Sequence, residues 1–199
     1  MKKIKLTLVR TLIIAAIASG LTLTAYAQVG DGPWTQEYPT YTVQLFGSGW
    51  NNGDYFGISD SNTSGEERAE RRYEDFSSGT HQFQGDVYVY ELGGDRICLK
   101  QTFQDNAGPW DMIAISKDGY LYAVESGDFL ADYAVGDTAQ VNTICYVSSA
   151  KDAIWINGSL IEYVYNGTGP YYHKCGTYRT GSGYGPIHAE WSNVSFWYK

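Results

Sequence analysis

The sequence has few basic residues for its acidic content. Its 199 residues contain 14 Lys and Arg against 22 Asp and Glu, which gives a formal net charge of −8. Four of the cations (Lys2, Lys3, Lys5 and Arg10) lie near the start, and the first 27 residues contain no acid. Without that segment, 10 basic and 22 acidic residues remain, a net charge of −12. This balance argues against general nucleic-acid binding, which requires many cations close to phosphates.

Long hydrophobic runs are missing after residue 27, so we expect no membrane-spanning helix in the rest of the chain. Residues 1–27 combine a basic start, an apolar stretch over residues 12–23 and the sequence Ala25-Tyr26-Ala27. This combination is typical of a secretory signal peptide cleaved near Ala27. A membrane anchor is the alternative, but small and polar residues interrupt the apolar stretch. We therefore expect a secreted protein, extracellular or periplasmic, whose mature domain spans residues 28–199.

Cysteine and histidine are scarce, and their spacing does not indicate a metal site. Cys98, Cys145 and Cys175 form no Cys-x-x-Cys pair, and the three histidines are scattered. Export permits a disulfide, but an odd number of cysteines leaves at least one thiol free, and all three pairings stay open. Buried free thiols are the other interpretation. We expect neither a metal nor a cofactor.

Helical periodicity is also absent after residue 27, where no stretch keeps apolar residues at i, i+3, i+4 and i+7 over three turns. Short runs rich in Val, Ile, Tyr, Thr and Trp are instead separated by Gly, Asp, Asn and Ser. The pattern predicts an all-β domain, a two-sheet antiparallel sandwich or jelly roll. Hairpin turns are expected at residues 93–94, 118–119, 157–158 and 166–167, and a poorly ordered lead-in at 30–38. The expected strands are residues 40–46, 55–59, 67–73, 81–91, 95–103, 112–116, 120–125, 141–148, 153–156, 159–165, 171–180 and 188–198.

One short segment, residues 68–72 (RAERR), concentrates charge in an expected strand. Because side chains alternate between the faces of a strand, Arg68, Glu70 and Arg72 project together. Two guanidinium groups beside one carboxylate form a cationic patch with a fixed orienting partner. A solvated edge strand is the plainer interpretation of such a charge run.

A second segment, residues 172–178 (YHKCGTY), places Tyr172, Lys174 and Tyr178 on one strand face by the same alternation. A tyrosine near cations is expected to have a lowered pKa, which suits it to proton transfer. Aromatic packing is the competing explanation in a chain with 18 Tyr. A third segment, residues 97–103 (ICLKQTF), carries Gln101 in an apolar strand, where its amide needs partners in the core or in a ligand.

The order of these three segments resembles the alginate-lyase-like jelly rolls of polysaccharide lyase family 7 and its relatives. The family pattern is Arg-(Thr/Ser)-Glu-Leu-Arg, then Gln-(Ile/Val)-His, then Tyr-Phe-Lys-Ala-Gly-x-Tyr. Here these are RAERR at 68–72, QTF at 101–103 and YHKCGTY at 172–178. Residues 189–196 (AEWSNVSF) also resemble the closing strand of such lyases. The first and third motifs are specific in combination, whereas the middle one is weak.

The resemblance implies a jelly roll whose concave face binds an acidic polysaccharide and cleaves it by β-elimination, with no nucleic-acid or membrane partner and as a monomer. By similarity, Arg68 and Gln101 would neutralise a uronate carboxylate. Tyr178 would act as the base at C5, as the acid toward O4, or as both. The resemblance further implies that substrate binding would involve Glu70, Arg72, Tyr172 and Lys174. Such chemistry needs fixed donors for the developing enediolate.

Three departures from the family pattern affect this interpretation. Phe103 stands where the family has a catalytic His. Either Tyr178 would act as both base and acid, or a histidine from a neighbouring strand, His81 first and then His188, would take the second role. A third alternative is that the fold has lost catalysis and only binds. Arg71 and Lys100 would point into the core of regular strands, which is costly without a partner or a bulge. These changes favour a uronate polymer such as glucuronan over alginate itself.

Two other functions stay open. A β-sandwich glycoside hydrolase needs two carboxylates about 5–9.5 Å apart, and Glu125, Glu162 and Glu190 are candidates without a paired motif. A non-catalytic carbohydrate-binding domain would use exposed aromatic residues, for which the candidates are Trp50, Trp110, Tyr120 and Tyr122. A lyase leaves a 4,5-unsaturated uronate, a hydrolase leaves only reducing ends, and a binding domain leaves neither.

Overall fold

A computed structural model describes residues 29–59, 65–105, 107–165, 167 and 169–199. The expected signal segment 1–27 and Asn166 of the expected turn at 166–167 lie outside the described residues. The described chain consists of β-strands and one 3-10 turn, η1 (Val147–Ser149). Within it, no helix is long and apolar enough to cross a membrane.

Fifteen strands make up the described fold, and their bounds follow the alternation of apolar and polar residues. They are β1 (Thr35–Glu37), β2 (Tyr41–Phe46), β3 (Gly49–Asn52), β4 (Tyr55–Ile58), β5 (Glu67–Tyr73), β6 (Thr80–Leu92), β7 (Asp95–Gln104), β8 (Gly108–Ser116), β9 (Tyr120–Ala123), β10 (Phe129–Asp132), β11 (Thr138–Tyr146), β12 (Lys151–Ile156), β13 (Ser159–Tyr165), β14 (Tyr171–Tyr184) and β15 (Ile187–Tyr198).

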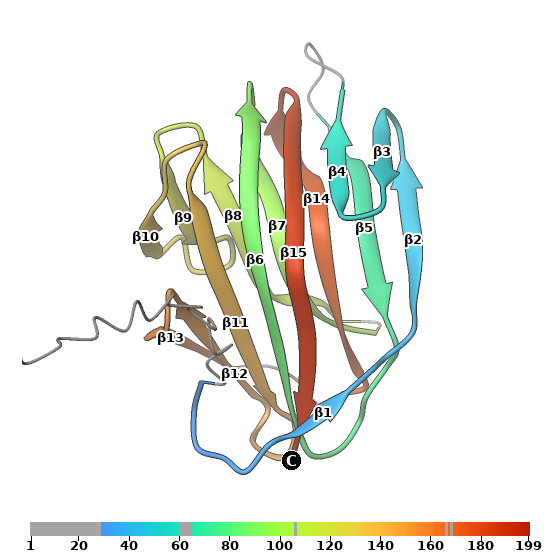
Figure 1. The fold of residues 1–199 in the computed structure, drawn as a ribbon, viewed down its shortest axis with the longest axis vertical. Helices are drawn as coiled ribbons and strands as arrows, with labels where there is room; N and C mark the ends of the chain where they lie inside the picture. Colours follow the sequence, from blue (N-terminus) through green and yellow to red (C-terminus); the bar gives the residue numbers. More distant parts are fainter. Residues whose placement is uncertain (1–28, 60–64, 106, 166, 168) are drawn as a thin grey trace, which may run out of the picture.

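The strands form two antiparallel sheets that lie face to face (Figure 1). The eight-stranded sheet has the order β13-β12-β11-β6-β15-β4-β3, with β1 paired to β15. The seven-stranded sheet has the order β10-β9-β8-β7-β14-β5-β2. Hairpin neighbours such as β11 and β12 alternate with neighbours from distant parts of the chain, such as β6 and β15 or β7 and β14, and the two-sheet jelly roll predicted from the sequence is confirmed.

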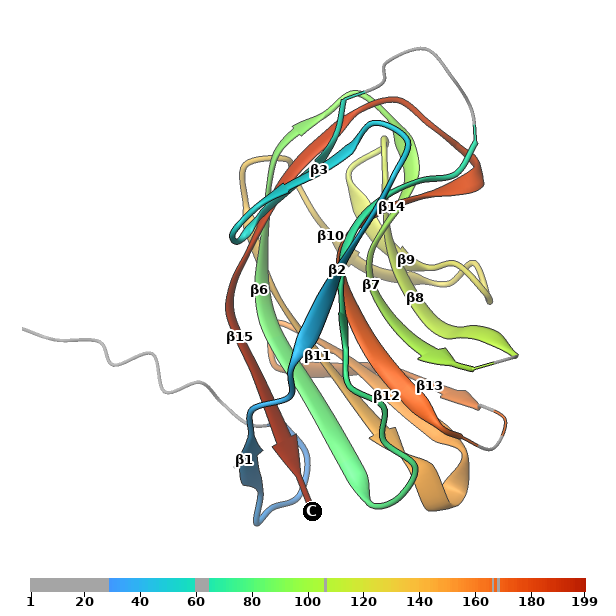
Figure 2. The same cartoon turned by 90° about the vertical axis from the view of Figure 1, so that its right-hand side faces the viewer.

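The hydrophobic core fills the space between the sheets. Its largest fully buried apolar side chains include Phe56, Phe83 and Trp191 of the eight-stranded sheet and Ile97 and Ile113 of the seven-stranded sheet. In the edge-on view of Figure 2, the strands of the seven-stranded sheet bend so that the outer face of this sheet is concave. The face opposite to the core is therefore the one shaped to hold a ligand.

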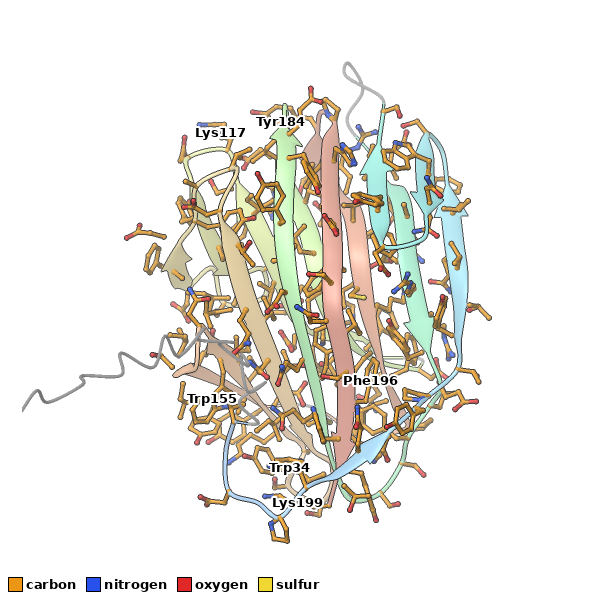
Figure 3. The ribbon with its side chains drawn as sticks, in the orientation of Figure 1. Trp34, Lys117, Trp155, Tyr184, Phe196 and Lys199 are labelled. Atoms are coloured by element: carbon orange, nitrogen blue, oxygen red, sulfur yellow. The ribbon has the colours of Figure 1, made fainter. Side chains whose placement is uncertain are left out.

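Most expected strands are present within a few residues of their expected bounds, and the 157–158 turn has the expected geometry. Asn157 and Gly158 have φ values of 51° and 79°, as a two-residue turn between β12 and β13 requires. The short strands β1, β3 and β10 were not expected. The segment expected as a poorly ordered lead-in contains β1, which is held by pairing with β15. Trp34 beside it lies under the Lys199 ammonium, 4.4 Å from the ring centroid (Figure 3).

Both cations that the sequence would place in the core have partners there. Arg71 donates from Nη2 to Asp54 Oδ1 at 2.7 Å, and its guanidinium lies over the rings of Tyr41 and Phe56. Lys100 is fully buried, donates from Nζ to Thr102 Oγ1 at 3.1 Å and lies 3.9 Å from Asp111 Oδ2. Lys100 therefore does not contribute a cation to the concave face, in agreement with the inward position that the sequence indicates.

All three cysteines are buried and carry free thiols. The disulfide left open by the sequence is therefore not formed. Burial raises the pKa of the Cys175 thiol to about 12. Cys175 packs with the core between the sheets, and its Sγ lies 3.7 Å from the Tyr73 hydroxyl.

Gly176 lies where β14 approaches β5 most closely. Its φ is 146°, and a methyl group on its Cα would lie 2.3 Å from the carbonyl oxygen of Ala69. We predict that Gly176→Ala lowers the free energy of unfolding by about 2–4 kcal/mol, because backbone atoms of β5 would have to shift. Urea denaturation measures this change.

Gly181→Ala in the same strand is the matched control, since an added Cβ there meets no atom within 4 Å. We expect it to change stability by less than about 0.5 kcal/mol. Equal losses in the two variants would show that the close approach at Gly176 is not the cause.

Candidate active site

The three sequence motifs come together on adjacent strands β5, β14 and β7 of the seven-stranded sheet. Tyr178 pairs with Arg68, and Lys174 pairs with both Arg72 and Gln101. Since Ala69 and Cys175 face the core, the alternating positions on these strands face outward. The outward positions are those of Arg68, Glu70, Arg72, Gln101, Phe103, Tyr172, Lys174 and Tyr178.

Glu70 is the centre of a charged network on this face. Its carboxylate is 1% exposed and lies 3.2 Å from Arg68 Nε and 3.6 Å from Lys174 Nζ. Gln101 Nε2 donates to the other carboxylate oxygen, Oε1, at 2.5 Å. One buried acid thus fixes side chains from three neighbouring strands.

Burial is the largest influence on the pKa values of Glu70 and Lys174. It raises the pKa of Glu70 above 4.5, while the charges of Lys174 and Arg68 and the Gln101 hydrogen bond oppose the shift. Burial also lowers the pKa of Lys174, against the attraction of Glu70. The attraction between Glu70 and its cations therefore offsets only part of the loss of hydration on both sides.

The members of this network differ in access to solvent. Gln101 is 1% and Lys174 is 2% exposed, whereas the Arg68 side chain retains 29% exposure. Lys174 Nζ is covered by Phe103, whose ring centroid is 5.1 Å away. Arg68 is thus the most accessible member of the network, and Lys174 chiefly holds Glu70 in place.

Tyr178 is held by a carboxylate as well as by a cation. Its hydroxyl donates to Glu66 Oε1 at 3.1 Å, and the Arg68 guanidinium lies over its ring at 4.7 Å. Burial and then the Glu66 hydrogen bond raise the pKa of Tyr178 to about 12, although Arg68 opposes the shift. The expectation of a lowered pKa is therefore wrong, because burial and the Glu66 carboxylate at the hydroxyl outweigh the effect of the Arg68 cation.

Arg72 and Tyr172 form a stacked group beside this network. Arg72 pairs with Asp75 at 2.6 Å, and its guanidinium lies 3.9 Å from the centroid of the Tyr172 ring. Phe103, at the position where the family has a His, stacks on Tyr172 with ring centroids 5.2 Å apart. The residue at the position of the family's catalytic His is thus an aromatic ring packed against Tyr172.

All three histidines lie away from the concave face. His81 belongs to β6 of the eight-stranded sheet and contacts Glu37 at 3.1 Å, so the structure does not bring it to Tyr178 as the sequence suggested. His188 belongs to the same sheet and stacks on Tyr90. His173 faces the core, where its Nδ1 lies 3.4 Å from Lys100 Nζ. No histidine is therefore placed to share proton transfer with Tyr178.

Two depressions meet at Arg68 and Tyr178, which line both. The larger, of about 490 Å³, is lined by these two residues, Glu66 and residues 43–46 of β2. The second, of about 260 Å³, extends over β7 and β8 and is lined by Arg68, Arg96, Gln101, Phe103, Pro109, Met112, Val124, Tyr178, Thr180 and Ser182. A chain that occupies both depressions must pass over the Arg68–Tyr178 pair.

Sequence reasoning missed two charged residues of this site, Glu66 and Arg96. The signal for Glu66 was the alternation itself, since Glu66 precedes Arg68 by two positions and shares its face. Arg96 follows a Gly-Gly turn in the left-handed conformation, with φ of 58°. Its place in the second depression depends on strand pairing and could not be inferred from spacing.

Of the three carboxylates proposed for a hydrolase, Glu125 and Glu162 lie near each other and Glu190 lies apart; burial, with smaller effects of the Asp111 and Glu162 charges, raises the pKa of Glu125 to about 7. Glu190 lies on β15 of the eight-stranded sheet, where it accepts a hydrogen bond from Tyr90. Glu125 follows β9 of the other sheet and accepts from the Met112 amide at 3.1 Å. Among the proposed aromatic platforms, Trp50 contacts His188 on the eight-stranded sheet, while Tyr120 and Tyr122 form a pair on the seven-stranded sheet. The third carboxylate, Glu162, accepts a hydrogen bond from Ser126 Oγ. The fourth aromatic candidate, Trp110, donates from its indole Nε1 to Gln104 Oε1.

Removal of the central carboxylate should unfold this region. We predict that Glu70→Ala lowers the free energy of unfolding by about 3–5 kcal/mol, because Arg68 and Lys174 lose their shared counter-ion. Urea denaturation measures the loss, and the exposed Glu74→Ala in the next segment is the control, with an expected change below about 1 kcal/mol. A Glu70→Ala protein as stable as this control would show that the network is not structural.

Comparison with known proteins supports the fold. No family model matches the sequence. No curated protein matches it either. Among solved structures, the family 7 alginate lyase AlyA1 from Zobellia galactanivorans matches with a TM-score of 0.60 and 16% identity, over 80% of this chain and 95% of that one. Alginate lyase AlgAT5 of polysaccharide lyase family 7 matches with a TM-score of 0.57 and 20% identity, over 72% and 78%. A sialidase matches with a TM-score of 0.56 and 13% identity, over 82% of this chain but 16% of that one. The chain thus has the jelly-roll fold of the alginate lyases, as the motifs predicted.

Proposed function

We propose that this protein is a polysaccharide lyase that cleaves a uronate polymer, such as glucuronan or alginate, by β-elimination on its concave face. The observation that carries the proposal is the place of Arg68 and Tyr178, which line both depressions of that face. A polymer that fills both depressions presents one glycosidic bond to this pair. The alginate lyases that share the fold support the same substrate class.

In the proposed reaction, Arg68 binds the carboxylate of the sugar that loses its C5 proton. Gln101, which lines the second depression, supplies the amide that faces the same carboxylate. Neutralisation of this charge makes the C5 proton more acidic and stabilises the enediolate that forms. Glu70 keeps Arg68 in place, while Arg72 and Tyr172 contact a neighbouring sugar.

Tyr178 acts first as the base and then as the acid. Its phenolate takes the C5 proton, the C5–H electron pair forms the C4–C5 double bond, and the C4–O4 bond breaks. The hydroxyl so formed donates its proton to the leaving O4, which restores the phenolate. No water is consumed, and no second proton carrier is needed in a site where Phe103 replaces the family's His.

A non-catalytic carbohydrate-binding domain is the second candidate. The stack of Phe103 on Tyr172 favours it, because the usual imidazole is replaced by an aromatic surface suited to sugar rings. Tyr120 and Tyr122 form a further aromatic pair on β9 of the same sheet, with ring centroids 5.9 Å apart. Such a protein would bind the polymer and release no product.

Loss of the Tyr178 hydroxyl tests the proposed reaction. We expect wild-type protein to form unsaturated uronate ends, seen as growing ultraviolet absorbance, from at least one polymer in a panel of uronate polymers. Tyr178→Phe should reduce this rate by at least about 10³-fold, because one group performs both proton transfers. Tyr184→Phe, at the other end of β14, should keep the wild-type rate. Full activity of Tyr178→Phe would contradict the mechanism.

The pH dependence tests the role of Glu66. Because the phenolate is the active form and the pKa of Tyr178 is raised to about 12, kcat/KM should rise about tenfold per pH unit across the neutral and alkaline range. Glu66→Gln removes the anion that holds the hydroxyl proton, so the pKa of Tyr178 falls and the rising limb moves to lower pH. Glu91→Gln on the other sheet is the control. A limb that stays in place or moves to higher pH in Glu66→Gln would contradict this role.

A further inference from the structure

We propose that Arg96 binds the carboxylate of a second uronate, next to the sugar held by Arg68 and Tyr178, so that the protein prefers polymers with carboxylates on consecutive sugars. This inference rests on the proposed function and names its substrate class. Arg96 and Tyr178 line the same depression of about 260 Å³. A sugar placed over Tyr178 therefore has its neighbour beside Arg96.

The other cations of the concave face are already neutralised by carboxylates of the protein. Arg68 and Lys174 share Glu70, and Arg72 pairs with Asp75. Arg96 has no acidic side chain within 4.0 Å among the residues that the structure describes. Its full charge is consequently available to an anionic ligand.

Two unpaired polar atoms mark the same region. The Nε of Arg96 is buried and has no hydrogen-bond partner within the described chain. The hydroxyl of Tyr122, a side chain only 9% exposed, is also without a partner among the described residues. Tyr122 packs with Met112 and Tyr178 on the outer face, and the charge of Arg96 opposes the effect of burial on the pKa of Tyr122. Buried donors without acceptors are costly, so Arg96, which lines the depression, favours a bound ligand with acceptor oxygens, while Tyr122 lies behind Met112 and Tyr178 of its wall.

The residues around Arg96 in the second depression favour an ion pair between its guanidinium and a ligand carboxylate. Pro109, Met112 and Val124 form its apolar side, and Thr180 and Ser182 place hydroxyls beside Arg96. An ion pair formed against apolar walls is weakened less by water than one at an open surface. The apolar side also suits the C–H face of a sugar ring, whereas the hydroxyls suit its polar edge.

The backbone at Arg96 is consistent with a functional constraint. Its φ of 58° is left-handed, a conformation that a long side chain adopts only at a cost. Glycine fits this conformation without strain. Arg96→Gly therefore removes the cation while the backbone keeps its shape, which makes it a better test than alanine.

The experiment compares wild type, Arg96→Gly and Arg96→Lys on two substrates: a uronate homopolymer, and a polymer in which uronates alternate with neutral sugars. We expect Arg96→Gly to raise KM on the homopolymer at least tenfold with kcat within about twofold, since a charge-assisted contact outside the bond-breaking step is lost. Arg96→Lys should recover part of the loss. On the alternating polymer, wild type and Arg96→Gly should be equally slow.

Lys117→Ala is the matched control. Lys117 is an exposed cation that pairs with Asp118 near Tyr184, at the end of the fold opposite to Lys199 (Figure 3). Its loss should leave KM unchanged, which separates a local contact from the overall charge. Equal KM values for wild type and Arg96→Gly on the homopolymer, or a preference of wild type for the alternating polymer, would overturn the proposal.

Calorimetric titration with a short uronate oligosaccharide separates this inference from the proposed function. If wild type forms no unsaturated product but binds the oligosaccharide at least tenfold more tightly than Arg96→Gly, the lyase proposal fails and the Arg96 subsite stands. If both proteins bind it equally, or neither binds it, the subsite is overturned whatever the activity.

Discussion

The buried carboxylate of Glu70 is the interaction on which the concave face depends. It contacts Arg68 from its own strand, Lys174 from β14 and Gln101 from β7, so it sets the relative positions of three strands. Two cations and an amide donor offset part of its loss of hydration. Arg68, held in this way, covers the ring of Tyr178 and leaves the Tyr178 hydroxyl to Glu66. The geometry of the Arg68–Tyr178 pair therefore depends on one buried carboxylate.

The acidic composition of the chain is compatible with an acidic substrate because its charges are arranged locally. The chain has a net charge of −8, yet its concave face gathers Arg68, Arg72, Arg96 and Lys174. Three of these are tied to carboxylates, which fix their positions but reduce their field. Attraction of a polyanion consequently depends on a few contacts at short range, within a Debye length of about 8 Å at physiological salt.

Strand alternation predicted which motif residues share a face of the sheet. This prediction was correct because the alternation of side chains depends only on the local backbone of each strand. Arg68, Glu70 and Arg72 project together, as do Tyr172, Lys174 and Tyr178. Burial, pairing and irregular register are properties of the folded sheets, and the sequence does not display them. Burial of Tyr178, and then the contact of its hydroxyl with Glu66, raise the pKa that the sequence led us to expect lowered. His81 was lost from the site because β6 belongs to the other sheet.

The class of reaction is the central claim, and the most direct test is mass spectrometry of the products formed from a uronate oligosaccharide in oxygen-18-labelled water. Elimination breaks the C4–O4 bond without water, so the account predicts two products whose masses add up to that of the substrate, with no labelled oxygen. Hydrolysis would place one labelled oxygen in a product and would contradict the account. An unchanged substrate, bound but not cleaved across the panel of uronates, would contradict it as well and would identify the protein as a binding domain.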